Sequence, residues 1–575
     1  MKLRSILFSS FLFFVFLSSG VFAQNQSTSK VNPKITKEVA PETKPTKVVT
    51  SENIEQDLAQ ALTLIEQNHV GGKKLDYNDL FKSTIDTMLH SLDPHSNYFD
   101  AKEFEQFRTD QSSQYFGIGA TIGDLSDSND KIIATYIKAT FEGSPANRAG
   151  LRYGDKIVEV NNVSMLGKSF VDVRNFLRGP RGTPARITVE RYGTGKRETV
   201  EIIRDAVPQP SIAEAYIVRP GIGYIAMTGG FNQTTYAEFV QAMQQLKAQG
   251  MKQLVLDLRN NGGGLVSQAY RVANTFLSKG QAIFTQKGRI DGASAPPYLS
   301  DNVNPDDTPL VILVNRNTAS ASEILAGALQ DHDRALIVGE NTFGKGLVQN
   351  PFVLEYGSML LLTIAKYETP SGRLIQRDYS NGNLYDYYTK GGTLGDESQP
   401  TKPTGVESKT DSGRKVFSGG GINPDEILKP QTITTERARS QAKFNDPIFA
   451  FVLDLAYGKN DTFPTYKVDR PIAFETDVKA TDFPITENLF QNFKKFAAEK
   501  YNFAPAQIDK ERQYIERNLR SELVTAAYGS TTSFQVLNEY DNQLKKAIEL
   551  LPEAKQLALE GAKANAKKEN TGLNR

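Results

Sequence analysis

The sequence has no cysteine and no tryptophan, and it has only four histidines in 575 residues. Without cysteine there are no disulfides, no thiolate metal ligands and no cysteine nucleophile. None of the histidines belongs to a His-Glu-x-x-His motif, and the chain has neither a Gly-x-Ser-x-Gly elbow nor a Gly-x-x-x-x-Gly-Lys-Ser/Thr loop. These absences count against zinc hydrolases, ordinary Ser-His hydrolases and phosphate-loop enzymes.

Neither sign of charge dominates, because 67 Lys and Arg stand against 66 Asp and Glu, giving a formal net charge of +1. Such a chain, without a basic stripe, has no electrostatic reason to bind nucleic acid or an anionic membrane. We expect no nucleic-acid partner, no cofactor and no metal. The length predicts roughly three or four domains.

Long apolar runs are also scarce. Lys2 and Arg4 precede an apolar run from Ile6 to Leu17, and small residues follow up to Ala23. This pattern predicts a signal peptide over residues 1–23. A membrane anchor is the alternative, but the run is shorter than the roughly 20 apolar residues of a spanning helix. We therefore expect a periplasmic or otherwise exported bacterial envelope protein, with no integral membrane span after cleavage.

The local pattern changes several times along the chain and predicts a multidomain protein of α/β and α+β class. The helical pattern predicts helices over Thr235–Ala248 and Val266–Phe276, and further helical stretches near 485–500, 506–527 and 534–562. Low aliphatic content over 378–420 indicates a long exposed insertion. The predicted segments are a disordered linker (24–50), an N-terminal helical domain (51–111), a strand-rich domain (112–205), an α/β core (206–432) and a C-terminal helical domain (433–575).

The strongest local feature is an apolar strand, Leu310–Val314, followed by the turn that contains Ser320. A strand-to-helix turn places this serine where the helix dipole and free amides stabilise a developing negative charge. That position suits a nucleophile. The alternative is a plain capping box, because Ser320 and Glu323 also have the spacing of that helix-start motif.

Lys345 lies 25 residues after Ser320, between Gly344 and Gly346. Burial there would lower the pKa of its amine, and a neutral amine can take the proton of a serine hydroxyl. The alternative is a solvated surface lysine. Gln349 can orient the amine through its amide oxygen, or it is an ordinary strand residue.

Three consecutive glycines, 262–264, follow another predicted strand, Gln253–Leu258. Backbone amides exposed at such a turn can supply half of an oxyanion hole. A simple turn or a phosphate-binding nest would use the same glycines.

Together these segments resemble the carboxyl-terminal processing peptidases, or tail-specific proteases, which are Ser-Lys serine proteases with a PDZ domain. The resemblance covers roughly residues 91–425 and depends on the order and spacing of short strings. These strings are Ser91–Ser96, Tyr115–Gly119, Asp257–Gly264, Ala319–Ile324, Thr342–Gln349, Thr369–Arg373 and Gly421–Asp425.

The resemblance implies a role for each candidate residue. Ser320 is the nucleophile, Lys345 is the general base and Gln349 is the partner of the lysine. The oxyanion hole is expected to use the backbone amide of Ala321 and a glycine amide, which we place at Gly263.

The resemblance also implies that residues 112–205 form a PDZ-like domain. Its Phe116-Gly117-Ile118-Gly119 segment is expected to bind the substrate C-terminus, with the peptide added as a strand. Without the resemblance this segment would be a strand with a glycine bulge.

The expected function is that of an exported serine endopeptidase that forms an acyl-enzyme and cuts polypeptides with accessible C-termini near their tails. The C-terminal helices are expected to serve self-association or to bind an adaptor. The alternatives are a non-catalytic PDZ scaffold and a latent protease that requires a partner.

Overall fold

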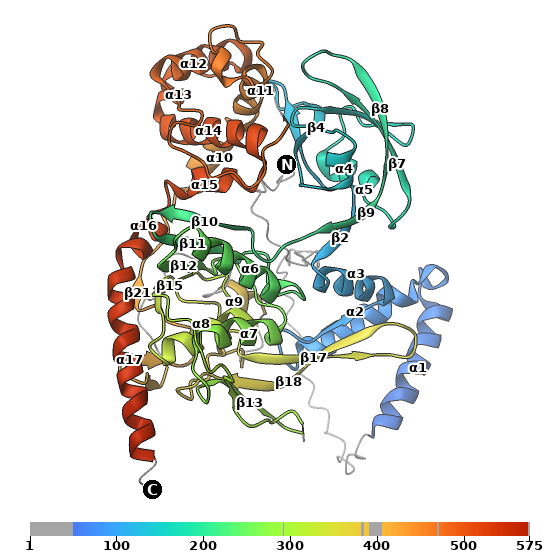
Figure 1. The fold of residues 1–575 in the computed structure, drawn as a ribbon. Helices are drawn as coiled ribbons and strands as arrows, with labels where there is room; N and C mark the ends of the chain where they lie inside the picture. Colours follow the sequence, from blue (N-terminus) through green and yellow to red (C-terminus); the bar gives the residue numbers. More distant parts are fainter. Residues whose placement is uncertain (1–49, 291, 381–383, 390–404, 469–470, 573–575) are drawn as a thin grey trace, which may run out of the picture.

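The computed structural model describes residues 50–290, 292–380, 384–389, 405–468 and 471–572 (Figure 1). The predicted signal peptide and nearly all of the predicted linker lie outside the described residues. Within these residues, no helix has the length and apolar character needed to cross a bilayer. The predicted fold class is confirmed, because helices, a strand-rich block, an α/β core and further helices follow one another along the chain.

The first block is helical and adds a strand to the core. β1 pairs antiparallel with β18 (Met359–Glu368), so the turn just before β1 reaches the core. The block consists of α1 (Ser51–Asn68), η1 (Gly72–Lys74), α2 (Tyr77–His90), β1 (Asn97–Phe99) and α3 (Ala101–Gln111).

The strand-rich block is a six-stranded sheet in the order β3-β4-β5-β7-β8, with β6 beside β5. β3 is an edge strand. The two ends of the block, β2 (Gln114–Gly117) and β9 (Asp205–Pro208), pair antiparallel and connect it to the core. Its other elements are β3 (Ala120–Ser126), β4 (Ile132–Thr140), α4 (Pro145–Arg148), β5 (Lys156–Val160), β6 (Val163–Ser164), α5 (Phe170–Leu177), β7 (Pro184–Glu190) and β8 (Arg197–Ile203).

The core is built on a sheet in the order β10-β11-β12-β15-β16-β21, which is parallel except at the β10–β11 pair. Helices α6 and α7 have the predicted bounds. The strands are β10 (Glu214–Arg219), β11 (Ile222–Ala226), β12 (Gln253–Asp257), β15 (Leu310–Val314), β16 (Leu336–Gly339) and β21 (Glu426–Ile427). The helices are α6 (Thr235–Ala248), α7 (Val266–Phe276) and α8 (Ala321–Asp331).

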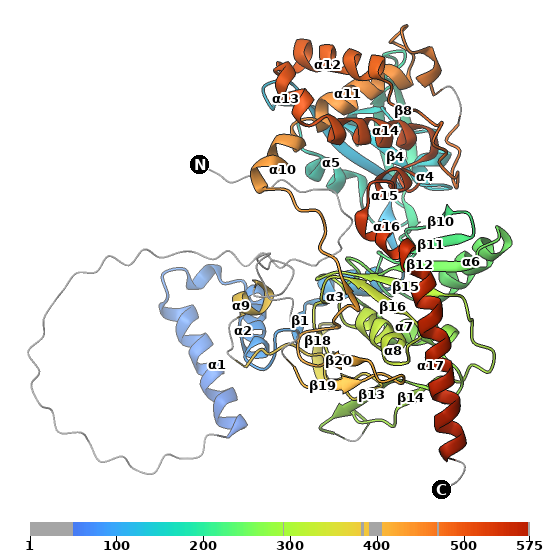
Figure 2. The ribbon, with the colours of Figure 1, turned by 90° about the vertical axis from the view of Figure 1, so that its left-hand side faces the viewer.

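Both faces of this sheet are covered, which explains why its central strands are apolar without alternation. Leu254, Leu256 and Ile312 pack with the layer of α6, α7 and α8. Val255 and Val311 pack with α16 (Asn542–Glu549) and α17 (Leu551–Gly572). Figures 1 and 2 show α17 running along the outside of the core.

A second sheet has the order β1-β18-β13-β14, with β17 beside β18. β17 begins two residues after the candidate lysine and pairs with β18 along its whole length. The strands added here are β13 (Ala282–Gly288), β14 (Tyr298–Leu299) and β17 (Leu347–Val353).

The described part of 378–420, which was predicted to be an exposed insertion, is exposed at many positions but buried at a few. Helix α9 (Leu384–Thr389) and the hairpin of β19 (Glu407–Lys409) and β20 (Lys415–Phe417) pack on the core. Tyr387, Thr410 and Val416 are each at most 5% exposed. Composition missed this burial because a few aromatic and polar side chains, rather than an aliphatic pattern, anchor the segment.

The C-terminal helices bridge the strand-rich block and the core. α11, α12 and α14 share a buried apolar cluster with β3 and β4, whereas α16 and α17 pack on the core sheet. The predicted stretch 534–562 is broken into three helices, because Asp541 caps α16 and α17 starts afresh at Leu551. The helices not yet given are α10 (Thr435–Ala442), α11 (Asn445–Ala456), η2 (Pro464–Tyr466), α12 (Glu487–Tyr501), α13 (Pro505–Lys510), α14 (Arg512–Tyr528) and α15 (Ser533–Asn538).

Candidate active site

Ser320 is the residue before α8, and its backbone adopts a conformation that side chains rarely take. Its φ is +57° and its ψ is −118°. A non-glycine residue in such a region stores strain of about 1–3 kcal/mol, which is common at active sites. The serine side chain makes no capping hydrogen bond to the helix. The turn therefore leaves the hydroxyl free of the structural role that a helix cap would give it.

Glu323 joins the two candidate catalytic segments. Its carboxylate is fully buried, and one oxygen, Oε2, accepts hydrogen bonds from the backbone amides of Ser320 and Lys345, each 2.8 Å long. The other oxygen accepts from Thr342 Oγ1 at 2.5 Å and from the Gly344 amide at 2.7 Å. Burial raises the pKa of Glu323, and these four donors oppose that rise. A single buried side chain thus holds the nucleophile turn against the lysine turn.

The Lys345 amine is partly buried and has an ordered partner. Nζ donates a 2.8 Å hydrogen bond to Gln349 Oε1, and the Gln349 amide nitrogen donates to the backbone carbonyl of His95. Burial lowers the pKa of Lys345 to about 8, although the negative charges of Asp93 and Glu323 act in the opposite direction. A substantial fraction of this amine is therefore neutral at mildly alkaline pH.

The amine and the serine hydroxyl do not touch in this conformation. Among the described residues, no hydrogen bond joins Lys345 Nζ to Ser320 Oγ, and the amine is bound to Gln349 instead.

An aromatic cluster lies beside the lysine turn and is built from three distant segments. The Tyr387 ring from α9 packs 5.8 Å from the Phe343 ring and 5.4 Å from the His95 ring, measured between centroids. The Tyr387 hydroxyl is 2.8 Å from His95 Nε2. Burial lowers the pKa of His95 well below its ordinary value, and the charges of Lys345 and Arg377 add to this effect. The cluster is therefore neutral and contributes to the low polarity around the amine.

The glycine loop after β12 lies directly against Ser320. Gly263 has a φ of +97°, and a Cβ atom there would lie 2.7 Å from the Ala319 carbonyl oxygen and 2.8 Å from Ser320 Cβ. Only glycine fits this close approach. The same Cβ would be 3.0 Å from the Ala321 amide nitrogen, so the two predicted oxyanion residues are neighbours. The Gly263 amide itself donates to Asn261 Oδ1 at 2.9 Å in this conformation.

The predicted tail-binding segment is divided between two elements. Phe116 and Gly117 belong to β2 and pair with β9. Ile118 is buried in the core of the strand-rich block, and Gly119, with a φ of +74°, leads into the edge strand β3. Neither the Ile118 amide nor the Gly119 amide donates a hydrogen bond to a described residue. These two amides and the open edge of β3 are what a C-terminal carboxylate and an added strand would need.

Similarity to known proteins places this arrangement in a family. Over 306 residues the chain is 35% identical to a carboxy-terminal-processing protease of Bartonella bacilliformis, which covers 52% of this chain and 68% of the relative. The chain belongs to the S41 family of serine-type peptidases, with the carboxy-terminal-processing proteases. The model of peptidase family S41 matches residues 221–386 of this S41 peptidase, and the PDZ domain model matches 137–191.

Another relative and a solved structure are also similar to part of the chain. A probable CtpA-like serine protease of Staphylococcus aureus is 36% identical over 304 residues, covering 53% of this chain and 59% of the relative. A solved photosystem II D1 C-terminal processing protease is 28% identical, covers 66% of this chain and 94% of its own, and has a TM-score of 0.34. Within the described residues of this S41 peptidase, no group of three or more His, Asp or Glu side chains could hold a metal ion.

The contacts of several residues in the site could not be predicted from the sequence of this S41 peptidase. In the sequence, Glu323 fits only a capping box, whereas in the structure it contacts both candidate segments. Asn261 braces the serine turn, since its carbonyl accepts from the Ala319 amide and from Ser322 Oγ, both at 3.0 Å. His95 lies in the string Ser91–Ser96, which contributes to the resemblance but implies no role for the histidine.

Proposed function

We propose that this S41 peptidase is an exported endopeptidase that cuts polypeptides near their C-terminal tails, with Ser320 as nucleophile and Lys345 as general base. The observation that carries the proposal is the shared Glu323 oxygen, which binds the backbone amides of both residues at 2.8 Å. The export signal expected over residues 1–23 supports a location in the bacterial envelope, and the bacterial curated relatives are consistent with it.

The chemistry follows from the arrangement. Ser320 Oγ attacks the scissile carbonyl carbon while its proton passes to the neutral amine of Lys345. The oxyanion is stabilised by the Ala321 amide and by an amide of the glycine loop. The lysine then gives its proton to the leaving amine, which leaves an acyl-enzyme. Water hydrolyses the ester and restores the serine, with the lysine again taking and returning the proton.

Substrate choice is assigned to the PDZ-like block. A C-terminal carboxylate is expected to bind the amides of Ile118 and Gly119, and the peptide to add to the open edge of β3. The Phe116 and Gly117 pair, held by β9, would fix the position of that site relative to the core. An accessible, extended tail is therefore the feature that selects a substrate.

The test is cleavage of an unfolded polypeptide with an apolar C-terminus by purified wild-type protein and by the Ser320→Ala and Lys345→Ala variants. Both variants are expected to lose turnover by at least about 10³-fold while staying folded. Ser278→Ala and Lys252→Ala change exposed residues of the same types and serve as matched controls. Fragments are identified by gel and mass spectrometry. Wild-type cleavage by either folded active-site variant would disprove the assignment and favour a non-catalytic scaffold.

A latent form of the same enzyme is the second candidate, and one contact favours it. The Gly263 amide is bound to Asn261 Oδ1. This amide must change partner before it can bind an oxyanion. If the latent form is correct, a short tail peptide added in trans will raise cleavage of a tailless substrate. Equal rates with and without the peptide would exclude latency.

A further inference from the structure

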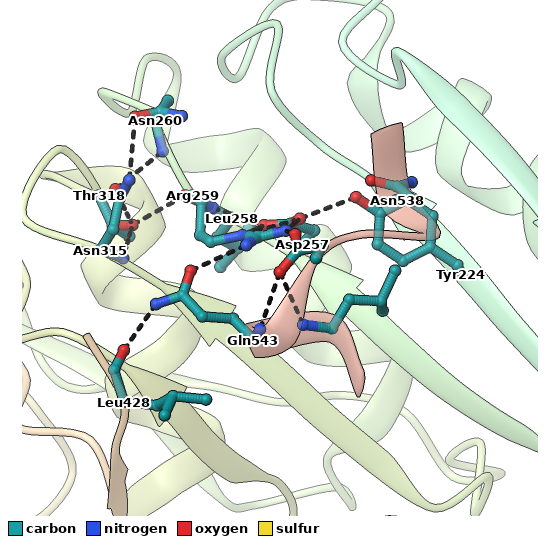
Figure 3. Close-up of polar contacts among 12 residues, drawn as sticks. Tyr224, Asp257, Leu258, Arg259, Asn260, Asn315, Thr318, Leu428, Asn538 and Gln543 are labelled. Atoms are coloured by element: carbon teal, nitrogen blue, oxygen red, sulfur yellow. Dashed lines mark hydrogen bonds and ion pairs between the residues drawn. The ribbon is translucent and has the colours of Figure 1, made fainter. Parts of the chain in front are cut away.

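Arg259 occupies an unusual position between β12 and the glycine loop. Its guanidinium is 14% exposed and binds Asp257 two residues earlier, with Nε 3.0 Å from both carboxylate oxygens. The same group also reaches the C-terminal helices. Nη1 donates to Gln543 Oε1 at 2.9 Å, and Nη2 lies 2.7 Å from Asp541 Oδ2. Figure 3 shows Arg259 between Asp257 and Gln543.

The two C-terminal partners are themselves fixed. Asp541 caps α16 by accepting from the amides of Gln543 at 2.8 Å and Leu544 at 3.0 Å. The Gln543 amide nitrogen donates to the Leu428 carbonyl at 2.6 Å, just after β21 (Figure 3). Burial disfavours the charge on Asp541, but Arg259 and the helix amides hold its pKa below the ordinary value. The first turn of α16 thus holds two acceptors, the Asp541 carboxylate and the Gln543 amide oxygen, in fixed positions for Arg259.

The loop that Arg259 anchors is bound on both sides of the nucleophile. The Asn260 amide donates to Asn315 Oδ1 at 2.9 Å, and Thr318 Oγ1 donates to the Leu258 carbonyl at 2.8 Å (Figure 3). The Asn261 carbonyl accepts from the residues on either side of Ser320–Ala321. Residues 258–261 therefore contact the serine turn at several points. Among them, Arg259 is the residue that also binds the C-terminal helices.

Apolar contacts also hold α16 in place. Leu544 and Ala547 of this helix are at most 1% exposed and pack on the core sheet. Apolar burial of this kind keeps a helix docked without polar contacts. Substitution of Asp541 or Gln543 leaves these apolar contacts of α16 unchanged.

We propose that Arg259 is a positioning residue through which Asp541 and Gln543 of the C-terminal helices fix the glycine loop and the serine turn. The proposal rests on the proposed function, in which Ser320 is the nucleophile, and gives the C-terminal helices a task in catalysis. Charge-assisted, buried hydrogen bonds are strong enough to set loop geometry, and a displacement of about 1 Å at a catalytic group costs about 100-fold in rate.

The test compares wild-type protein with Asp541→Asn, Gln543→Met and the double variant. Asparagine retains the helix cap but removes the charge, and methionine retains the volume but removes both amide bonds. The readout is kcat and KM on a short peptide without a tail. We expect kcat to fall about 10-fold in each single variant and up to about 100-fold in the double variant. KM and the melting temperature should stay near wild type.

Asp76→Asn is the matched control, because Asp76 caps α2 in the same way through the amides of Asn78 and Asp79. It should leave kcat unchanged. Wild-type kcat in the folded double variant would overturn the proposal. So would a loss of kcat that only follows a loss of folded protein, or an equal loss in the Asp76→Asn variant.

Hydrogen exchange separates this proposal from the proposed function. Amides of residues 258–264 and 319–322 should exchange faster in the double variant than in wild type, whether or not peptide is cleaved. If these amides exchange faster in the double variant but the wild-type protein cleaves no peptide, the positioning role is supported and the proposed function is contradicted. Unchanged exchange at these amides would disprove the positioning role by itself.

Discussion

The two halves of the site are held in different ways. The Ser320 half is held by chain segments that lie close together in the core fold: the glycine loop after β12, the turn after β15 and Glu323 of α8. The Lys345 half depends on Gln349, on the backbone of His95 254 residues away from Gln349, and on Tyr387 of the insertion. The proposed nucleophile is thus positioned by the core alone, whereas the proposed base is positioned by contacts from several distant segments of the chain.

This difference predicts how each half responds to change. Substitutions in the nucleophile half should alter geometry and lower kcat at every pH. Substitutions in the base half should also move the pH at which the enzyme gains activity, because they alter the surroundings of a titrating amine.

The largest effect is expected from Gly263→Ala. The new Cβ would meet the Ala319 carbonyl at 2.7 Å and the Ser320 side chain at 2.8 Å in a backbone region that favours glycine. We expect kcat/KM to fall by more than about 10³-fold. Gly280→Ala is the control, since Gly280 also has a positive φ, +90°, but nothing within 4 Å of the new atom. Comparable loss in both variants would show that backbone strain, rather than the contact with Ser320, is responsible.

Glu323→Gln should affect both halves at once. The amide replaces one of two acceptor oxygens that together bind four donors, so at least one buried donor loses its partner. We expect kcat to fall about 100-fold and the free energy of unfolding to fall by about 1–3 kcal/mol. Glu103→Gln changes the equivalent position of the α3 capping box and should leave kcat unchanged. Equal kcat in the two variants would contradict the bridging role.

The pH profile of wild-type kcat/KM should report the base half. Because burial lowers the pKa of Lys345 to about 8, the amine is protonated and inactive below that pH. The rate should rise about tenfold per pH unit up to neutrality and level off above about pH 9. Melting temperatures over the same range serve as the control for unfolding. A flat profile between about pH 5 and about pH 9 would rule out an amine base.

The smallest effects should come from the surroundings of the lysine, and they should have opposite signs. Gln349→Leu removes an acceptor that favours the ammonium, so the pKa of Lys345 and the acid limb of the profile should move down. Tyr387→Ala admits water, which should move the pKa and the acid limb up. The charges of Asp93, Glu323 and Arg377 and the neutral His95 remain in place.

Tyr385→Ala is the control. Tyr385 lies in the same helix as Tyr387 but is 74% exposed, so its loss should not move the acid limb of the pH profile. Shifts of the same sign in the Gln349→Leu and Tyr387→Ala variants would show that the two residues do not act through polarity around the amine.

Much of the core was readable from local sequence, and the reason is its short-range periodicity. The strand Leu310–Val314 and the helices Thr235–Ala248 and Val266–Phe276 were predicted with the bounds that the structure shows. The stretch 534–562 was predicted less well, although Asp541 and Pro552 are helix-start signals within it. Periodicity finds an apolar face but does not by itself separate consecutive helices that share one.

The candidate site was readable only in part. Ser320 and Lys345 are marked by a strand-to-helix turn and by flanking glycines, which are local signals. The roles of His95 and Tyr387 arise from a contact between side chains 292 residues apart, which no local pattern encodes. The burial of the insertion likewise depends on partners elsewhere, such as the salt bridge between Arg414 and Asp333.

The attachment of Arg259 to Asp541 and Gln543 also bears on the order in which the protein is made. Synthesis proceeds from the N-terminus, so His95 and the serine turn emerge from the ribosome long before the first turn of α16. An unfinished or C-terminally clipped chain would carry the proposed pair Ser320 and Lys345 without the proposed anchor for its glycine loop. Such a chain is expected to be a poor protease even though both side chains are present.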